Sequence, residues 1–169
     1  MTAANKLYYT LRIPADLPQD IPALDIGLFE AGFEPPSPDV VGDFQASAFT
    51  PYQKPAIGGA ALPRLQWAIA CKLTEDEAMQ LAALYRWQQT RLGSKLDGRL
   101  EWIDRFEPTE PQPVAELTRD IVDAKTTGYG MVYGFLVVAC LISRPSRQLV
   151  SKRRTTPMRL CSFSVLEVR

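Results

Sequence analysis

The chain has 169 residues, of which 46% are hydrophobic and 22% are charged, and its 19 basic residues balance its 19 acidic ones. This composition is typical of one folded domain, and it argues against a disordered chain or a uniform positive field for nucleic acid. Histidine is absent, which excludes Ser-His-Asp and Cys-His catalysis and histidine-containing zinc sites. We therefore expect a single domain over residues 1–169.

The N-terminal third predicts one strand followed by a long proline-rich arm. Apolar and polar residues alternate over Lys6–Ile13, as in a half-buried strand. Prolines then interrupt residues 14–63, where only the apolar piece at 24–33 could form one or two helical turns. Loops of this length in a compact domain are usually functional or disordered. Three aromatic residues of the arm are expected to be buried against neighbouring copies: Phe44, Phe49 and Tyr52.

A strand-helix-strand unit follows, between Leu65 and Trp102. Alternating apolar residues run into Thr74-Glu75-Asp76-Glu77, the pattern with which a helix caps its own first turn. The helix is expected to continue to Leu92 and to stop at Gly93, before a short strand that contains Trp102. This order predicts one well-capped helix between two strands.

Apolar spacing separates the aromatic residues of this unit into core and surface candidates. The helix stripe predicted to face the core is Ala78, Leu81, Ala82 and Tyr85. Trp67 and Trp102 lie within apolar strand patterns and are expected in the core. Trp87 is off the helix stripe, so it is the tryptophan expected at an interface.

The C-terminal part predicts an insertion and two further strands. Residues 105–129 contain a second proline cluster and a possible short helix at 114–122, and Gly128-Tyr129-Gly130 is interpreted as a turn. Residues 130–142 are rich in β-branched residues, which suits a central strand buried on both faces. Residues 143–156 are expected to form a loop or hairpin before a last strand at 158–168. The fold class predicted is mainly β (α+β): a β-sandwich or small barrel with one helix and long proline-rich loops.

Charge is unevenly distributed in this half of the chain. Residues 144–159 carry six basic residues and no acid, whereas residues 101–123 are rich in acids. These segments are either solvated loops or complementary patches through which copies of the chain meet, with Arg153 and Arg154 at the contact. The three cysteines, Cys71, Cys140 and Cys161, lie in apolar strand patterns and are expected to be free thiols in the core, which fits a reducing compartment.

Catalytic chemistry has little support in the sequence. Acids at Asp97, Glu101, Asp104 and Glu107 are close in sequence, but such spacing is common on any surface. The glycine pairs lack the spacing that phosphate binding requires. We expect no catalytic, cofactor-binding or metal-binding residues and no membrane span.

Residues 50–104 and the last ten residues resemble a known family. The order Tyr52-Gln53-Lys54-Pro55, Trp67 in a strand, Leu73-Thr74 before an acidic helix start, and a return strand with Trp102 is similar to the minor tail and distal tail proteins of lambda-type long-tailed bacteriophages. The closing segment 160–168 resembles their last strand. The N-terminal strand and the insertion at 105–129 depart from that pattern.

The resemblance implies a structural virion protein made in the host cytoplasm. Such a protein forms a ring, usually hexameric, that joins the tail tube to the baseplate or tip, and it has no active site. Its partners are copies of itself and the tube and tip proteins, with no membrane and no sequence-specific nucleic acid. The alternative is a monomeric binding module whose basic segment at 144–159 docks nucleic acid or an acidic protein.

Overall fold

The computed structural model describes residues 8–27, 39–41, 64–151 and 158–168, with backbone alone at 39–41 and 149–151. Their strands form one antiparallel sheet, whose order is β2-β1-β5-β7-β9-β4-β3, with β6 added beside β7 and β8 beside β9. The strands are β1 (Tyr9–Arg12), β2 (Leu24–Ile26), β3 (Asp39–Val41), β4 (Arg64–Thr74), β5 (Leu100–Asp104), β6 (Asp120–Thr126), β7 (Val132–Ile142), β8 (Ser146–Ser151) and β9 (Met158–Glu167). The helices are α1 (Glu75–Gly93) and the short 3-10 helix η1 (Val114–Glu116).

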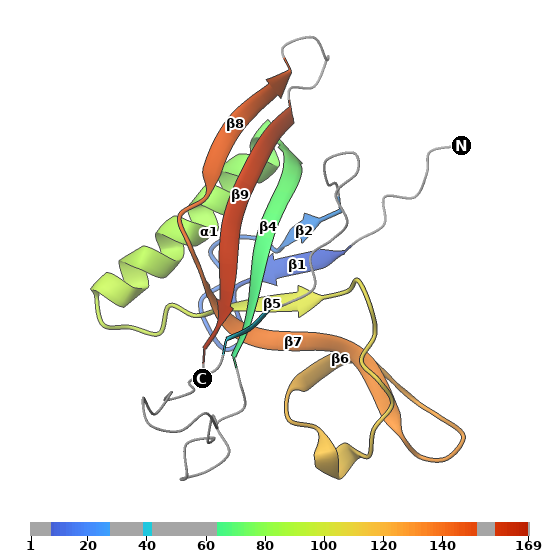
Figure 1. The fold of residues 1–169 in the computed structure, drawn as a ribbon. Helices are drawn as coiled ribbons and strands as arrows, with labels where there is room; N and C mark the ends of the chain where they lie inside the picture. Colours follow the sequence, from blue (N-terminus) through green and yellow to red (C-terminus); the bar gives the residue numbers. More distant parts are fainter. Residues whose placement is uncertain (1–7, 28–38, 42–63, 152–157, 169) are drawn as a thin grey trace, which may run out of the picture.

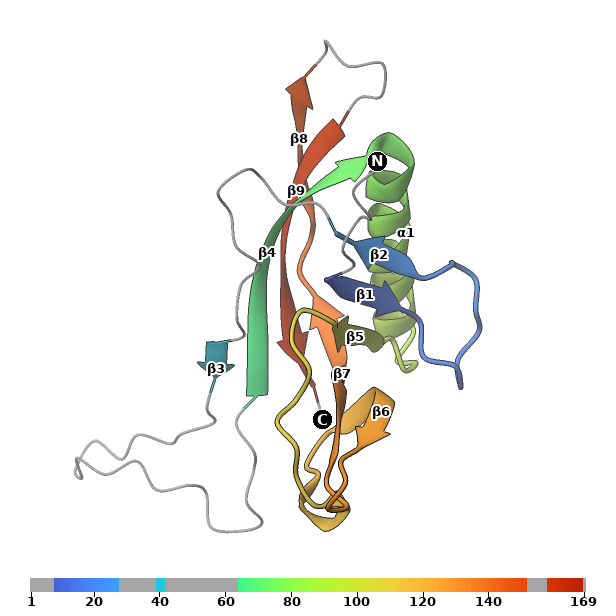
Figure 2. The ribbon, with the colours of Figure 1, turned by 90° about the vertical axis from the view of Figure 1, so that its right-hand side faces the viewer.

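The mainly β, α+β class is confirmed, and the sheet is open. In the described residues its path begins at β2 and ends at β3, so the strands form neither a closed barrel nor two separate sheets. Figure 1 shows β4, β8 and β9 running across the direction of β1, β5 and β7. Figure 2 shows α1 beside one face of this bent sheet, where it covers strands from both parts.

Strand β7 connects the two directions of the sheet. One edge of β7 pairs with β5, from Leu100↔Cys140 to Asp104↔Leu136. Along its other edge, β6 pairs with the first half of β7, and β9 pairs with its last three residues. The first half of β7 can therefore extend beyond the body together with β6, while its end remains part of the central sheet.

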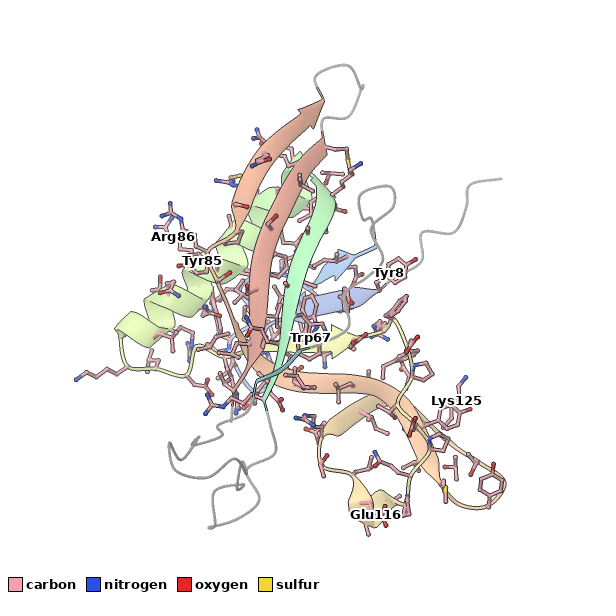
Figure 3. The ribbon with its side chains drawn as sticks, in the orientation of Figure 1. Tyr8, Trp67, Tyr85, Arg86, Glu116 and Lys125 are labelled. Atoms are coloured by element: carbon pink, nitrogen blue, oxygen red, sulfur yellow. The ribbon has the colours of Figure 1, made fainter. Side chains whose placement is uncertain are left out.

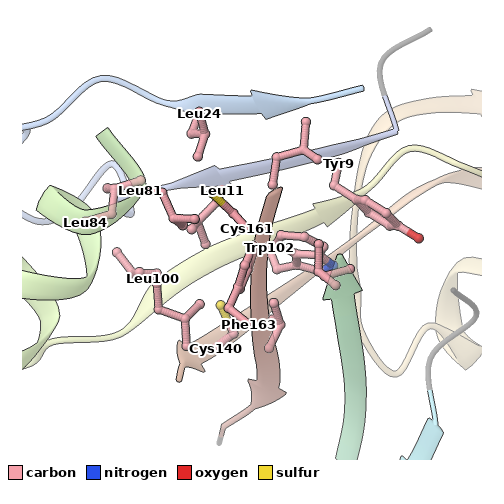
Figure 4. Packing of buried hydrophobic residues seen from close by; sticks show 14 of the residues in the cluster. Tyr9, Leu11, Leu24, Leu81, Leu84, Leu100, Trp102, Cys140, Cys161 and Phe163 are labelled. Carbon is pink, nitrogen blue, oxygen red and sulfur yellow. The ribbon is translucent and has the colours of Figure 1, made fainter. Parts of the chain in front are cut away.

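The core lies between α1 and the sheet and is centred on aromatic residues. Tyr9 stacks on Trp102 with ring centroids 4.7 Å apart, and Trp102 contacts Trp67 and Phe163 at tilted and edge-on angles. Figure 4 shows Tyr9, Trp102 and Phe163 beside leucines from α1, β1 and β5. Both tryptophans are fully buried, as predicted, and so are the three free cysteines. Burial raises the pKa of each cysteine thiol, so these thiols behave as small apolar side chains.

The predicted capping box is present at the start of α1. The amide of Glu77 donates to Oγ1 of Thr74 at 3.3 Å, and the amide of Thr74 donates to Oε2 of Glu77 at 2.9 Å. Each bond supplies a partner to an amide that the first helical turn leaves free. The sequence therefore fixes the residue at which β4 ends and α1 begins.

Two possible helices in the sequence differ from the structure where it can be compared, and residues 28–33 of the first lie outside the described residues. Residues 24–26 form β2, because pairing with β1 places Leu24 and Ile26 on the core face and leaves Asp25 outside, where it accepts a bond from the Thr10 hydroxyl. In the segment 114–122, only η1 is helical, and β6 begins at Asp120. Both segments are too short for their apolar spacing to distinguish helix from strand, so pairing with a neighbouring strand decides.

The remaining strand predictions hold, with one difference in burial. The strand predicted at 6–13 is present as β1, and the basic segment forms a hairpin in which β8 pairs with β9. The sequence predicts that β7 is buried on both faces. In β7, Val138, Cys140 and Ile142 are buried, whereas the alternate residues are only half-buried. The helix covers one face of the sheet, so the other face keeps part of its surface exposed.

Candidate interaction surfaces

A groove of about 500 Å³ lies between the C-terminal half of α1 and the loop that follows β1. Its apolar lining comes from the helix, the loop and the segment after the helix, and two arginines of α1 add positive charge. The groove residues are Asp20, Ile21, Ala83, Arg86, Trp87, Thr90, Arg91, Ser94 and Leu96. We refer to this surface as the helix groove.

Hydrogen bonds from α1 hold the loop wall of the helix groove in place. The indole Nε1 of Trp87 donates to Oδ2 of Asp20 at 3.2 Å. Two helical turns before Trp87 and outside the groove, Gln80 Nε2 donates to the carbonyl oxygens of Pro22 and Ala23 at 2.7 and 3.0 Å. The described beginning of the proline-rich arm is thus packed on the helix, and the groove is formed before any partner binds.

Trp87 belongs to the buried side of α1, not to a separate surface stripe. The buried line runs through Ala78, Leu81, Leu84 and Trp87, a succession of i, i+3 steps that the predicted stripe did not follow. Trp87 is only 8% exposed, and the guanidinium carbon of Arg91 lies 5.1 Å from the centre of its ring. It supplies the floor of the helix groove. The other predicted contact residues lie outside the described residues: Phe44, Phe49, Tyr52, Arg153 and Arg154.

The second surface is a projection formed by residues 109–134, which includes η1, β6 and the beginning of β7. We call this projection the arm, and it is separate from the proline-rich segment at 14–63. Figure 1 shows it extending from the body at the end opposite to β8. Two backbone bonds between Gln112 and Val132 close it on the side away from β6, and the amide of Thr109 donates to the carbonyl of Gly134. The arm is therefore a folded projection with its own hydrogen-bond ladder.

Apolar side chains are exposed on this arm. Tyr129 is 80% exposed and Val114 is 64% exposed. The predicted turn at Gly128-Tyr129-Gly130 is confirmed, and Tyr129 projects from it. Sequence reasoning missed the role of this residue as a surface feature, although an aromatic residue between two turn glycines was a signal for it.

An ion pair joins the base of the arm to the last strand. Arg119 donates from Nε to Oε1 of Glu167 at 2.8 Å and from Nη2 to Oε2 at 3.0 Å. Oε2 of Glu167 also accepts from the amide of Leu65 at 2.8 Å. Because Glu167 is almost fully buried, loss of one partner would leave an uncompensated charge. This pair fixes where the arm leaves the body.

Several charges in the basic and acidic segments, which were expected in solvated loops or in contacts between copies, have partners within the chain. Arg159 makes two bonds to the carboxylate of Glu75, at 2.7 and 3.2 Å, and these bonds lower the pKa of that carboxyl. Glu101 accepts from Arg12 at 2.7 Å. Part of the basic and acidic segments is therefore used to join β9 to α1 and β1 to β5.

The four acids considered for catalysis lie along β5 and its flanks. Glu101 and Asp104 are three residues apart on one strand, so they project from opposite faces of the sheet. Burial raises the pKa of Asp104, but its two oxygens already accept bonds from Nε1 of Trp67 and the amide of Phe106. These contacts give Asp104 a structural role at the end of β5. Within the described ranges, no cluster of three potential metal ligands is found.

The comparisons with known proteins do not assign a function. No protein-family model, no curated protein and no solved structure matches this chain. In the part of the chain that the structure describes, no helix is both long and apolar enough to span a membrane. The helix groove and the arm are therefore the features from which a function can be inferred.

Proposed function

We propose that this protein is a structural virion protein that assembles into a ring, with hexameric symmetry, at the distal end of a bacteriophage tail. In this role it joins the tail tube to the baseplate or tip, has no catalytic function and needs no cofactor. The observation that carries the proposal is the arm, which projects from the body with Tyr129 and Val114 exposed. Apolar groups of this kind on a folded projection are expected to be covered by another chain.

The edges of the sheet also support association with other chains. Strands β6 and β8 each have one unpaired edge in the described structure, and unpaired edges can bind a further strand. At β6 a bulge interrupts the ladder between Val122 and Lys125, and Asp123 adopts a positive φ of 52°. A bulge discourages continuous pairing along an edge, so side-chain contacts of the arm are favoured over strand addition there.

The position in a phage tail is inferred from the local sequence resemblance. The resembling unit contains β4, α1 and β5, and its capped junction at Thr74 has the geometry that the sequence pattern predicts. This unit forms the scaffold that supports both proposed surfaces: α1 forms one wall of the groove, and β5 pairs with β7, from which the arm extends. A protein whose regular elements support projecting contact surfaces suits a ring component better than an enzyme.

Measurement of the assembled mass tests the proposal directly. Sedimentation velocity and native mass spectrometry of the purified full chain are expected to show a concentration-dependent hexamer, and negative-stain micrographs are expected to show rings with an open lumen. Antibody-gold labelling of virions that contain the protein should place it at the distal tail end. A single-chain mass at high concentration, together with unlabelled tails, would contradict the proposal.

The monomeric binding module is the weaker candidate. Its basic segment includes Arg159, which is bonded to Glu75, and the exposed Arg147, whose guanidinium lies 3.4 Å from the sulfur of Met79. The first of these contacts neutralises one of the charges that nucleic acid would require. Binding of nucleic acid that falls steeply as salt rises, by a chain that stays monomeric, would favour this alternative.

A further inference from the structure

The tip of the arm is a preformed knob. The amide of Thr127 donates to the carbonyl of Met131 at 2.7 Å, and the amide of Met131 donates back to the Thr127 hydroxyl at 3.1 Å. Gly130 completes the turn at a φ of +78°, which glycine adopts without a steric penalty. Tyr129 is therefore presented on an ordered backbone, and its docking needs little further loss of backbone freedom.

The helix groove has the lining to receive such a side chain. Its apolar residues include Ile21, Trp87 and Leu96, and Leu96 is 53% exposed although it is a large aliphatic residue. A tyrosine buries roughly 150–250 Å² in a protein contact and prefers tilted or offset packing on another ring. The volume of about 500 Å³ is ample for one tyrosine side chain and the turn that carries it.

The groove carries two arginines against one acid, Asp20, and the arm carries an excess of acids, so the charges of the two surfaces are complementary. Figure 3 shows Arg86 projecting away from α1, and Arg91, five residues later on the helix, also lines the groove. On and beside the arm, exposed acids outnumber the exposed Lys125. These exposed acids are Glu107, Glu110, Glu116 and Asp120. An acidic arm approaching a groove with two arginines is favoured in orientation and in rate of encounter.

The two surfaces lie on different parts of the molecule. In Figures 1 and 3 the arm, with Glu116 and Lys125, is at the lower right, whereas the C-terminal end of α1 is at the left. In a two-fold dimer, each arm would have to reach its partner's groove across one shared interface, which two surfaces facing different directions disfavour. This geometry favours a head-to-tail contact, which closes into a ring when the rotation between neighbours permits.

We propose that Tyr129 of one copy inserts into the helix groove of the next copy. The inference rests on the proposed function, because it names the contact by which the ring forms. The tyrosine ring packs against Trp87 and Leu96, and the acids of the arm face Arg86 and Arg91. Each subunit thus contributes its arm to one neighbour and its groove to the other.

Two variants that each damage one face test this arrangement. Tyr129→Asp removes the knob at an exposed turn, and the double variant Arg86→Glu/Thr90→Glu places negative charge at exposed groove positions. Each variant alone is expected to associate at least about 30-fold more weakly than the unmodified chain, as for the loss of a hot-spot residue. Met79→Asp, which adds a charge at an exposed position near the other end of α1, is the matched control and should assemble normally.

Mixing the two variants is the decisive step. The Arg86→Glu/Thr90→Glu variant keeps an intact arm and the Tyr129→Asp variant keeps an intact groove, so one functional contact can form between them. An equimolar mixture should therefore give a heterodimer in native mass spectrometry. Circular dichroism and thermal unfolding of each variant establish that it is folded. A mixture that stays monomeric while both variants are folded would overturn the inference.

The outcomes for the unmodified chain separate the two proposals. If it assembles and both variants assemble equally well, the knob-and-groove contact is wrong, the helix groove serves another protein or a small ligand, and the proposed ring stands. If the unmodified chain is monomeric at all concentrations, the proposed function itself is wrong, and the inference falls with it.

Discussion

Gln88 offers a sharp test of how α1 is attached to the sheet beneath the helix groove. This residue is 1% exposed, and its side-chain amide bonds to both backbone groups of Ile142 at the end of β7. Nε2 donates to the Ile142 carbonyl at 2.9 Å, and Oε1 accepts from the Ile142 amide at 2.9 Å. The side chain thereby supplies the pair of bonds that a neighbouring strand would otherwise provide.

Replacement of Gln88 by methionine keeps the length of the side chain and removes both bonds. Each buried backbone group left without a partner costs about 1–3 kcal/mol. Methionine is more hydrophobic than glutamine and offsets part of this loss, so we expect the free energy of unfolding to fall by about 3 kcal/mol. For a domain of this size, that corresponds to a decrease in Tm of about 6–12 °C.

Urea denaturation and differential scanning calorimetry measure this effect. The matched control is Gln89→Met, because Gln89 is the next residue on the same helix and is exposed. The control is expected to change the free energy of unfolding by no more than about 0.5 kcal/mol. If Gln88→Met and Gln89→Met were equally stable, the two bonds to Ile142 would not be holding the helix, and our account of its attachment would be refuted.

Two further predictions concern the arm and the end of β5. Gly134→Ala would place a Cβ atom 2.7 Å from the carbonyl oxygen of Val122, so it should destabilise the pairing of β6 with β7 by more than about 1 kcal/mol. Gly128→Ala is the control, because a Cβ atom there meets nothing within 4 Å and should not disturb the pairing. Amide hydrogen exchange in β6 measures the difference, and equal protection in the two variants would contradict it. Burial raises the pKa of Asp104, so between about pH 4 and that raised pKa the folded state keeps a proton that the unfolded state has lost. The free energy of unfolding should therefore fall as the pH rises through this range. Asp104→Asn should lack this pH dependence. Urea denaturation across the range measures the free energy of unfolding of both proteins, and a difference between them that stays constant with pH would contradict the prediction.

Local patterns were sufficient to predict the strand-helix-strand unit. The capping box at Thr74 depends on residues within four positions of one another, so its bonds could be predicted without knowledge of the rest of the chain. The fully buried positions of Trp67 and Trp102 could be predicted from the alternation of the strands that contain them. The hairpin at β8 and β9 also connects segments that are close in sequence.

The candidate surfaces could not be predicted in the same way. The helix groove requires Asp20 and Ile21 to lie against a helix more than sixty residues later in the chain, and no local pattern encodes that contact. The predicted stripe of α1 did not include Trp87 in the buried line, because the core against which the helix packs follows a slightly different line along it. Exposure of Tyr129 likewise depends on how far the arm extends from the body.

The sequence by itself determined the class of the fold, the capped helix and the aromatic core, because these follow from spacing, propensity and burial of apolar side chains over short distances. Tertiary structure decided that the strands form one bent, open sheet rather than a sandwich or barrel. It also decided which charges are paired within the chain, such as Arg119 with Glu167 and Arg159 with Glu75. The physical reason is that strand partners and ion pairs are chosen by contacts between distant segments, whose energies exist only once the chain has folded.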